Sequence, residues 1–145
     1  MIKLIVDSTC DLNCEILDNH DVEVIPLSIT IDDKTYLDGV DITTDRVYEY
    51  MKDGKVPKTS QVSFESVSQA VEKCISKESD FIYLAFSSKL SGTYSFAKKI
   101  IDMYKEKYPE RKMAIIDSKG GAGGTGLIAI QVLKMIERNL PFEYI

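Results

Sequence analysis

Three short apolar segments, each followed by a polar turn and a helical pattern, are the feature that most constrains the fold of this chain. They span residues 2–6, 81–85 and 113–116. Strands that alternate with helical segments favour an α/β protein with a mainly parallel sheet, because a parallel connection needs a crossover element. We therefore predict a three-layer α/β/α fold, formed as one domain by residues 1–145.

The turns after these strands are expected to meet at one edge of the sheet. They span residues 7–11, 87–93 and 117–126, and the carboxyl ends of parallel strands form the edge where ligands bind in such folds. The second turn and the start of its helix hold five hydroxyl side chains within nine residues, Ser87, Ser88, Ser91, Thr93 and Ser95. One hydroxyl suffices to cap a helix. The surplus, beside the free N–H groups of a helix N-terminus, favours a binding site for a carboxylate or phosphate.

Weaker patterns complete the first half of the chain. A first helix is expected from the turn at residues 7–11 to about residue 18. Residues 22–31 are rich in Val and Ile but contain Pro26, which argues against a central strand. With the turn at residues 32–34 they indicate an edge strand or a small hairpin.

The remaining segments predict helices and one loop. Helices are expected over residues 45–52 and 63–78, with a polar loop over residues 55–61 between them. Another helix is expected to begin at Ser91 and to bury Phe96, Ile100 and Met103. A last helix is expected after the glycine-rich loop.

Composition limits the classes of partner. The net charge of −5, without a basic face or an arginine cluster, argues against nucleic acid. No apolar run is long enough to cross a membrane and no secretion signal is found, so we expect a cytoplasmic protein without an integral membrane segment. Three cysteines are an odd number, which suits a reduced compartment. Cys10, Cys14 and His20 fall short of a usual zinc site, so no metal is expected and the cysteines are assigned to the core or a helix face.

One alternative is a small NAD(P)-dependent dehydrogenase-like domain. Gly121–Gly126 matches GxGxxG, and Tyr94 with Lys98 matches the Tyr-x-x-x-Lys pair of short-chain dehydrogenases. However, the glycine motif follows the pair instead of preceding it, and it lacks the second strand that should end in an acidic residue about 20 residues later. We therefore interpret the glycines as a flexible or close-approach loop.

Nucleophilic catalysis is also weakly supported. Ser91 would need a neighbouring base, and the only histidine, His20, lies in a polar stretch that reads as a surface turn. Asp7 and Asp117 end two predicted strands and could form a carboxylate pair, but we interpret them as helix caps.

Taken together, five motifs resemble the DegV family of bacterial fatty-acid-binding proteins. They are Asp7-Ser8-Thr9-Cys10-Asp11-Leu12, Pro26-Leu27-Ser28-Ile29, Lys58-Thr59-Ser60-Gln61, Ser87-Ser88-Lys89-Leu90-Ser91-Gly92-Thr93-Tyr94, and Asp117-Ser118-Lys119 with glycines after it. The resemblance implies a protein that binds a long-chain fatty acid and holds its carboxylate for phosphorylation by a separate fatty acid kinase, which is dihydroxyacetone-kinase-like and uses ATP. It implies that this chain needs no cofactor and is not itself an enzyme.

The resemblance also implies particular site residues. In the family the carboxylate is held by the threonine of the Thr-Ser-Gln motif and by the serine before Gly-Thr, which match Thr59 and Ser91. Neutral donors at a helix N-terminus stabilise an anion without a tight ion pair, so its oxygen stays available as a nucleophile. Ala122 stands where the family usually has a serine. The loops around the site supply the expected supporting residues, which are Ser8, Thr9, Ser60, Gly92, Thr93, Asp117 and Ser118.

Family members carry a second α/β domain that closes over the acyl chain, and this chain resembles the amino-terminal domain alone. The resemblance therefore implies that part of the lipid tunnel lies outside residues 1–145. A further alternative is a noncatalytic remnant that self-associates through the apolar surface which a second domain would cover.

Overall fold

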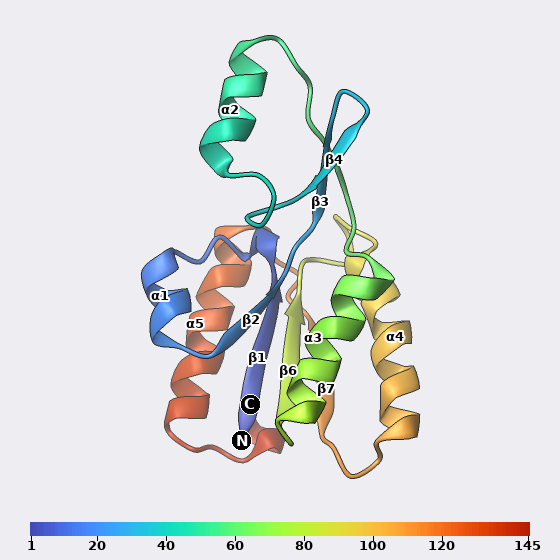
Figure 1. Ribbon diagram of the computed structural model, residues 1–145. Helices are drawn as coiled ribbons and strands as arrows, with labels where there is room; N and C mark the ends of the chain where they lie inside the picture. Colours follow the sequence, from blue (N-terminus) through green and yellow to red (C-terminus); the bar gives the residue numbers. More distant parts are fainter.

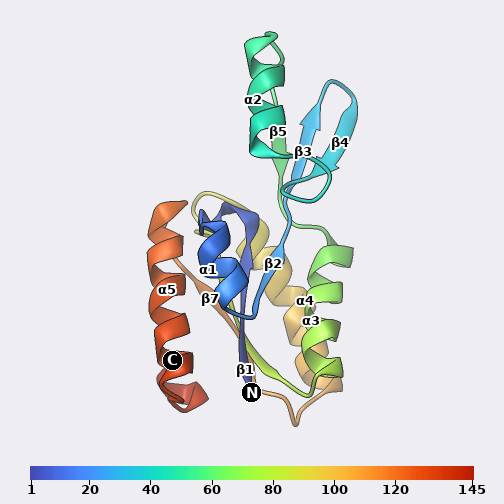
Figure 2. The ribbon, with the colours of Figure 1, turned by 60° about the vertical axis from the view of Figure 1, so that its left-hand side comes forward.

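The structure, a computed structural model, describes residues 1–145, apart from the side chains of Cys14 and Asp18. It contains a four-stranded parallel sheet and a smaller, three-stranded antiparallel sheet (Figure 1). Helices cover both faces of the parallel sheet, and the small sheet stands beyond its carboxyl edge, as Figure 2 shows from a second direction. The predicted α/β class with a mainly parallel sheet is confirmed.

The parallel sheet has the strand order β2-β1-β6-β7. Its strands are β1 (Ile2–Asp7), β2 (Val22–Ile25), β6 (Asp80–Ala85) and β7 (Met113–Asp117). All neighbouring strands run parallel. The two central strands, β1 and β6, are buried along almost their whole length, which explains their nearly continuous apolar sequences.

Four helices form the outer layers. On one face lie α1 (Cys14–Asn19) and α5 (Gly123–Glu137), and on the other lie α3 (Phe64–Ser76) and α4 (Thr93–Lys107). Successive residues of β1 serve different faces, since Ile5 belongs to the α3/α4 core cluster whereas Leu4 and Val6 belong to the α5 cluster. Each such side chain contributes about 1.5–3 kcal/mol through burial. This alternation confirms the three-layer α/β/α arrangement.

The small sheet has its own core. It contains β3 (Ser28–Ile31), β4 (Lys34–Leu37) and β5 (Lys58–Ser60), all paired antiparallel in the order β4-β3-β5, with α2 (Thr44–Lys52) packed nearby. Ile29, Ile31 and Ile42 are buried together. The predicted hairpin is confirmed, with Asp32 in a left-handed conformation at its turn. The two 3-10 helices of the chain are η1 (Ser8–Cys10) and η2 (Phe142–Tyr144).

Residues 22–31 form two strands in two different sheets. β2 ends just before Pro26, and β3 begins at Ser28 in the small sheet. Because proline has no N–H group to donate to a ladder, the chain leaves the parallel sheet at this residue. Pro26 correctly predicts that β2 lies at an edge, whereas the change of sheet is a new finding.

The expected polar loop over residues 55–61 is wrong in part. Its residues Lys58–Ser60 form β5, in which Thr59 pairs with Ile29 of β3. All three side chains of β5 are exposed, so the segment lacks the apolar alternation by which a strand is recognised. Its pairing depends on a partner far away in the sequence.

The expected helix boundaries also need correction. The first helix is interrupted, because Asp11 adopts a left-handed conformation between η1 and α1. α4 begins at Thr93 instead of Ser91, and α5 begins at Gly123, inside the expected loop. Within α4, Ile100 is buried and Phe96 packs partly against the core, but Met103 is 60% exposed because it lies on the outer face of the helix.

The close packing of α5 on η1 gives a stability prediction. An added Cβ atom at Gly126 would lie 2.5 Å from the backbone oxygen of Cys10, whereas at Gly124 it would meet no atom within 4 Å. We expect Gly126→Ala to lower the free energy of unfolding by about 1–3 kcal/mol, because backbone must move. Gly124→Ala, the matched control, should be neutral or stabilising by up to about 1 kcal/mol. Urea unfolding checks both, and equal stability of the two variants would contradict this account.

Candidate functional site

The three turns that follow β1, β6 and β7 meet at the carboxyl edge of the parallel sheet, as the sequence predicts. Asp7 at the end of β1 accepts a hydrogen bond from the Phe86 N–H at 2.9 Å. The Ser118 N–H donates to the Ala85 carbonyl at 3.1 Å, and the Ser87 N–H donates to the Gly120 carbonyl at 3.3 Å. These bonds join strand-end turns that lie far apart in the sequence.

The two strand-end aspartates hold these turns together. Asp7 is fully buried, caps η1, and accepts bonds from the Thr9 N–H at 3.2 Å and from the Thr9 hydroxyl. Asp117 accepts bonds from the Ser88 hydroxyl at 2.6 Å and from the Ser88 N–H at 3.0 Å. Hydrogen bonding from Ser88 lowers the pKa of Asp117. The cap interpretation is therefore confirmed for Asp7, and both carboxylates organise loops.

A cavity of about 340 Å³ is lined by residues of the small sheet and of the turns at this edge. We call it the junction cavity. The parallel-sheet turns and the small sheet both contribute to its lining, which consists of Thr9, Leu27, Ile29, Asp38, Thr59, Ser60, Gln61, Phe86, Leu90 and Ser91. Thr59 and Ser91, the two residues expected to bind a carboxylate, thus line the same cavity from different parts of the fold.

Ser91, which lies just before the N-terminus of α4, gives this cavity one of its hydroxyl groups. Gly92 is the N-cap residue and supplies no side chain, so the first N–H groups of the helix lack a side-chain cap at this position. The Ser91 hydroxyl accepts a bond from the Thr93 N–H at 3.2 Å and donates to the Thr93 hydroxyl at 3.0 Å. Thr93 is fully buried, so this pair fixes the orientation of Ser91. The Ser91 hydroxyl could donate a hydrogen bond to a ligand anion instead of to the Thr93 hydroxyl, while it still accepts the bond from the Thr93 N–H.

The polar lining can hold an anion through neutral donors. Among the described residues that line the cavity, none carries a positive charge, and Asp38 is the one ionised side chain. Leu27, Ile29, Phe86 and Leu90 add an apolar surface beside the hydroxyl groups of Thr59 and Ser91. An apolar cavity with a few polar groups suits a ligand with a hydrocarbon part and a small oxygen-bearing head.

Comparison with known proteins identifies the family of this chain. The sequence matches the profile of the family described as "Uncharacterised protein, DegV family" over residues 1–145. The chain belongs to the DegV family. A DegV domain-containing protein of Clostridium perfringens is 32% identical over 143 residues, which make up 98% of this chain and 50% of that protein.

Solved structures of DegV proteins share the fold. A stearic-acid-binding protein from Eubacterium ventriosum matches with a TM-score of 0.92 at 35% identity, over 99% of this chain and 50% of that one. A DegV family protein from Thermus thermophilus, described as binding fatty acid, matches with a TM-score of 0.82 at 25% identity, over the same shares of the two chains. This DegV chain therefore spans about half the length of the curated relatives it matches.

The other expected supporting residues of this DegV chain occupy different positions. Thr9 and Ser60 line the junction cavity. Ser8 accepts a bond from the Leu27 N–H at 3.2 Å and lines a separate hollow beside α1. Ser118 hydrogen-bonds Gly120 in its own loop and Thr125 in the first turn of α5. With Gly92, Thr93 and Asp117, it lies outside the cavity lining and acts on the shape of the loops.

Six lining residues were not predicted as site residues from the sequence, namely Leu27, Ile29, Asp38, Gln61, Phe86 and Leu90. Leu27 and Ile29 alternate along one face of the chain, which is a signal for a shared surface, but nothing local tells which surface they share. Asp38 follows a strand without any distinctive motif. Gln61 completes the Thr-Ser-Gln motif, and its carboxamide lies so close to Gly92 that a Cβ atom there would collide with it.

The side chains invoked by the enzyme alternatives lie apart or pair elsewhere. His20 bonds Glu137 at 2.9 Å and lies at the amino end of the sheet, opposite Ser91. Lys98 is exposed and pairs with Asp102 on α4, while Tyr94 packs against the core, so neither supports a dehydrogenase site.

The side chains of two cysteines belong to the described part of the chain. Cys10 and Cys74 are buried, as expected, and burial raises the pKa of Cys74 to about 11, so its thiol stays protonated and unreactive. The side chain of Cys14 lies outside the described structure.

No described helix of this DegV chain has the length and apolarity that a membrane span requires.

Proposed function

We propose that residues 1–145 form the carboxylate-binding half of a fatty-acid-binding protein. The observation that carries the proposal is the joint placement of Thr59 and Ser91 in one cavity, next to the N-terminus of α4 and to apolar side chains. In this proposal the two hydroxyls donate to the carboxylate, and the apolar lining contacts the first methylene groups of the tail. The relatives described as binding stearic acid and fatty acid support this ligand class.

The chain then acts as a binding component, and a separate fatty acid kinase supplies the ATP chemistry. Hydrogen bonds from neutral hydroxyls leave lone pairs of the carboxylate free, whereas a bidentate ion pair would occupy them. A phosphoryl group could therefore be transferred to the held carboxylate by a partner protein. We also propose that the rest of the acyl tail is covered by a second domain of the kind found in this family, outside residues 1–145.

A ligand titration tests the function. We expect palmitate to bind the purified chain in a calorimetric titration, and organic extracts of the purified protein to contain a fatty acid by mass spectrometry. NAD(P)H, the ligand of the dehydrogenase alternative, should give no heat and no change in melting temperature. Binding of the nicotinamide cofactor without binding of palmitate would overturn the proposal.

A further inference from the structure

The polar groups that line the junction cavity are of two kinds. Thr59 and Ser91 carry hydroxyls whose protons can be offered to a ligand, because the Ser91 proton is otherwise donated to the neutral Thr93 hydroxyl, a weaker acceptor than an anion. The Thr9 hydroxyl differs, because it donates its proton to the buried carboxylate of Asp7. Thr9 can therefore offer only lone pairs to the cavity. It acts as an acceptor. Asp38, which contributes to the lining of this cavity and of the hollow beside α1, brings a second acceptor group to this region.

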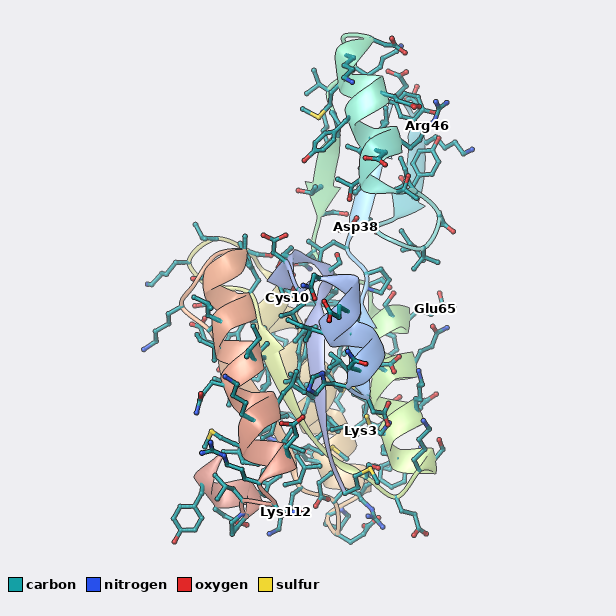
Figure 3. The ribbon with its side chains drawn as sticks, turned by 90° about the vertical axis from the view of Figure 1, so that its left-hand side faces the viewer. Lys3, Cys10, Asp38, Arg46, Glu65 and Lys112 are labelled. Atoms are coloured by element: carbon teal, nitrogen blue, oxygen red, sulfur yellow. The ribbon has the colours of Figure 1, made fainter. Side chains whose placement is uncertain are left out.

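Asp38 is the more consequential acceptor, because it carries a full charge. It directly follows β4, and its N–H donates to the Leu27 carbonyl at 2.9 Å, which anchors it to another segment of the cavity lining. Figure 3 shows it where the small sheet joins the rest of the molecule. Among the ion pairs of the described side chains, none includes Asp38. Its charge is thus not neutralised by a neighbouring cation of this chain.

We propose that Asp38 is a specificity-determining residue that opposes the negative charge of the bound head group. The inference rests on the proposed function, since it concerns the same cavity and a carboxylate held by Thr59 and Ser91. Asp38 lowers the affinity for a ligand with a carboxylate head group but not for a ligand of the same chain length with an uncharged head group. The site therefore holds its anion loosely, which suits a protein that must hand its ligand to a partner.

The size of the effect follows from Coulomb's law. For an assumed separation of about 8 Å and an effective dielectric constant of about 20 to 80, the repulsion between two like charges weakens binding by about threefold to thirtyfold. An uncharged ligand experiences no such penalty. The ratio of affinities for an acid and for the corresponding alcohol is therefore the quantity that isolates the charge of Asp38 from any change in packing.

The test compares Asp38→Asn with Asp33→Asn, titrated calorimetrically with dodecanoate and with dodecanol. Asp33→Asn makes the same change of net charge. It serves as the control because Asp33 lies exposed at the turn of the same hairpin and outside the junction cavity. We expect Asp38→Asn to bind dodecanoate about threefold or more tightly than the unaltered chain, with dodecanol affinity nearly unchanged. Asp33→Asn should leave the ratio unchanged. Asp38→Ser, a second neutral variant, should show the same increase in dodecanoate affinity, and it replaces Asp38→Asn in the test if that variant folds poorly.

Two results would overturn the inference in distinguishable ways. In the first, dodecanoate binds the unaltered chain, but Asp38→Asn or Asp38→Ser lowers the dodecanoate affinity or changes the affinities for dodecanoate and dodecanol equally. Asp38 then does not act through its charge, and only this inference fails. If neither lipid binds the unaltered chain or any variant, the proposed function is contradicted and the inference falls with it.

Discussion

Palmitate affinity is expected to fall by about tenfold or more in Ser91→Ala and in Thr59→Val, and by about a hundredfold or more when both are combined. A hydrogen bond to a charged group contributes about 1.5–3 kcal/mol, and each substitution removes one such donor from the junction cavity. The fold should survive both changes. Thr59 is exposed on β5, and the loss of the Ser91 contact with Thr93 resembles the loss of one helix cap, about 1 kcal/mol.

Matched controls distinguish this loss from general damage. Thr30→Val changes a threonine on the neighbouring strand β3, outside the cavity lining, and Ser95→Ala changes an exposed serine within α4. Both should bind palmitate like the unaltered chain in a competition titration against a fluorescent acyl probe. If Ser91→Ala and Thr59→Val bind as tightly as these controls, the carboxylate lies elsewhere and the assignment of these two residues is wrong.

The parallel sheet and the meeting of its turns could be predicted because their signals are local. β1 and β6 are nearly continuous apolar runs that end in capping residues, and a parallel sheet necessarily places such ends at one edge. The hydroxyl-rich turn before α4 could likewise be recognised from composition. Thr59 and Ser91 themselves were assigned through the family resemblance, and the structure adds that they line one cavity.

The other half of the cavity could not be predicted, because it depends on where the small sheet stands. β5 is a short strand of exposed polar residues, and only its pairing with β3 makes it a strand. Pro26 marks the end of β2, but no local pattern shows that the chain then crosses into another sheet. The positions of Asp38 and Leu27 in the lining follow from that crossing. They are therefore a tertiary property of the chain.

The burial of single residues is also decided by tertiary packing. Thr93 follows directly after the exposed Gly92, yet it is fully buried and its hydroxyl accepts a hydrogen bond from Ser91. Met103 follows Ile100 at a helical spacing, yet it is 60% exposed because it lies on the outer face of α4, whereas Tyr104 packs against the core. A sequence pattern gives the face of a helix, whereas the width of the buried stripe depends on the neighbouring elements.

The largest effect is expected from the half of the family's length that lies outside residues 1–145. The junction cavity, at about 340 Å³, is near the lower end of the range for pockets that bury most of a small ligand. Leu90 and Leu127, near the carboxyl edge, are 67% and 72% exposed, so apolar side chains are available there for another surface to cover. Part of a long acyl tail bound by this chain alone would therefore remain in water.

We expect this chain to bind palmitate about a thousandfold more weakly than the full-length stearic-acid-binding relative, because five or six exposed methylene groups at about 0.8 kcal/mol each forfeit about 4–5 kcal/mol. The matched control is the corresponding half of that relative, which should bind as weakly as this chain. Sedimentation velocity accompanies the calorimetric titration, since self-association through the exposed leucines could cover part of the tail and restore affinity as protein concentration rises. A monomeric chain with nanomolar affinity for palmitate would contradict the prediction, because the groove would then be complete within these residues and the tail would lie in a place other than the exposed edge.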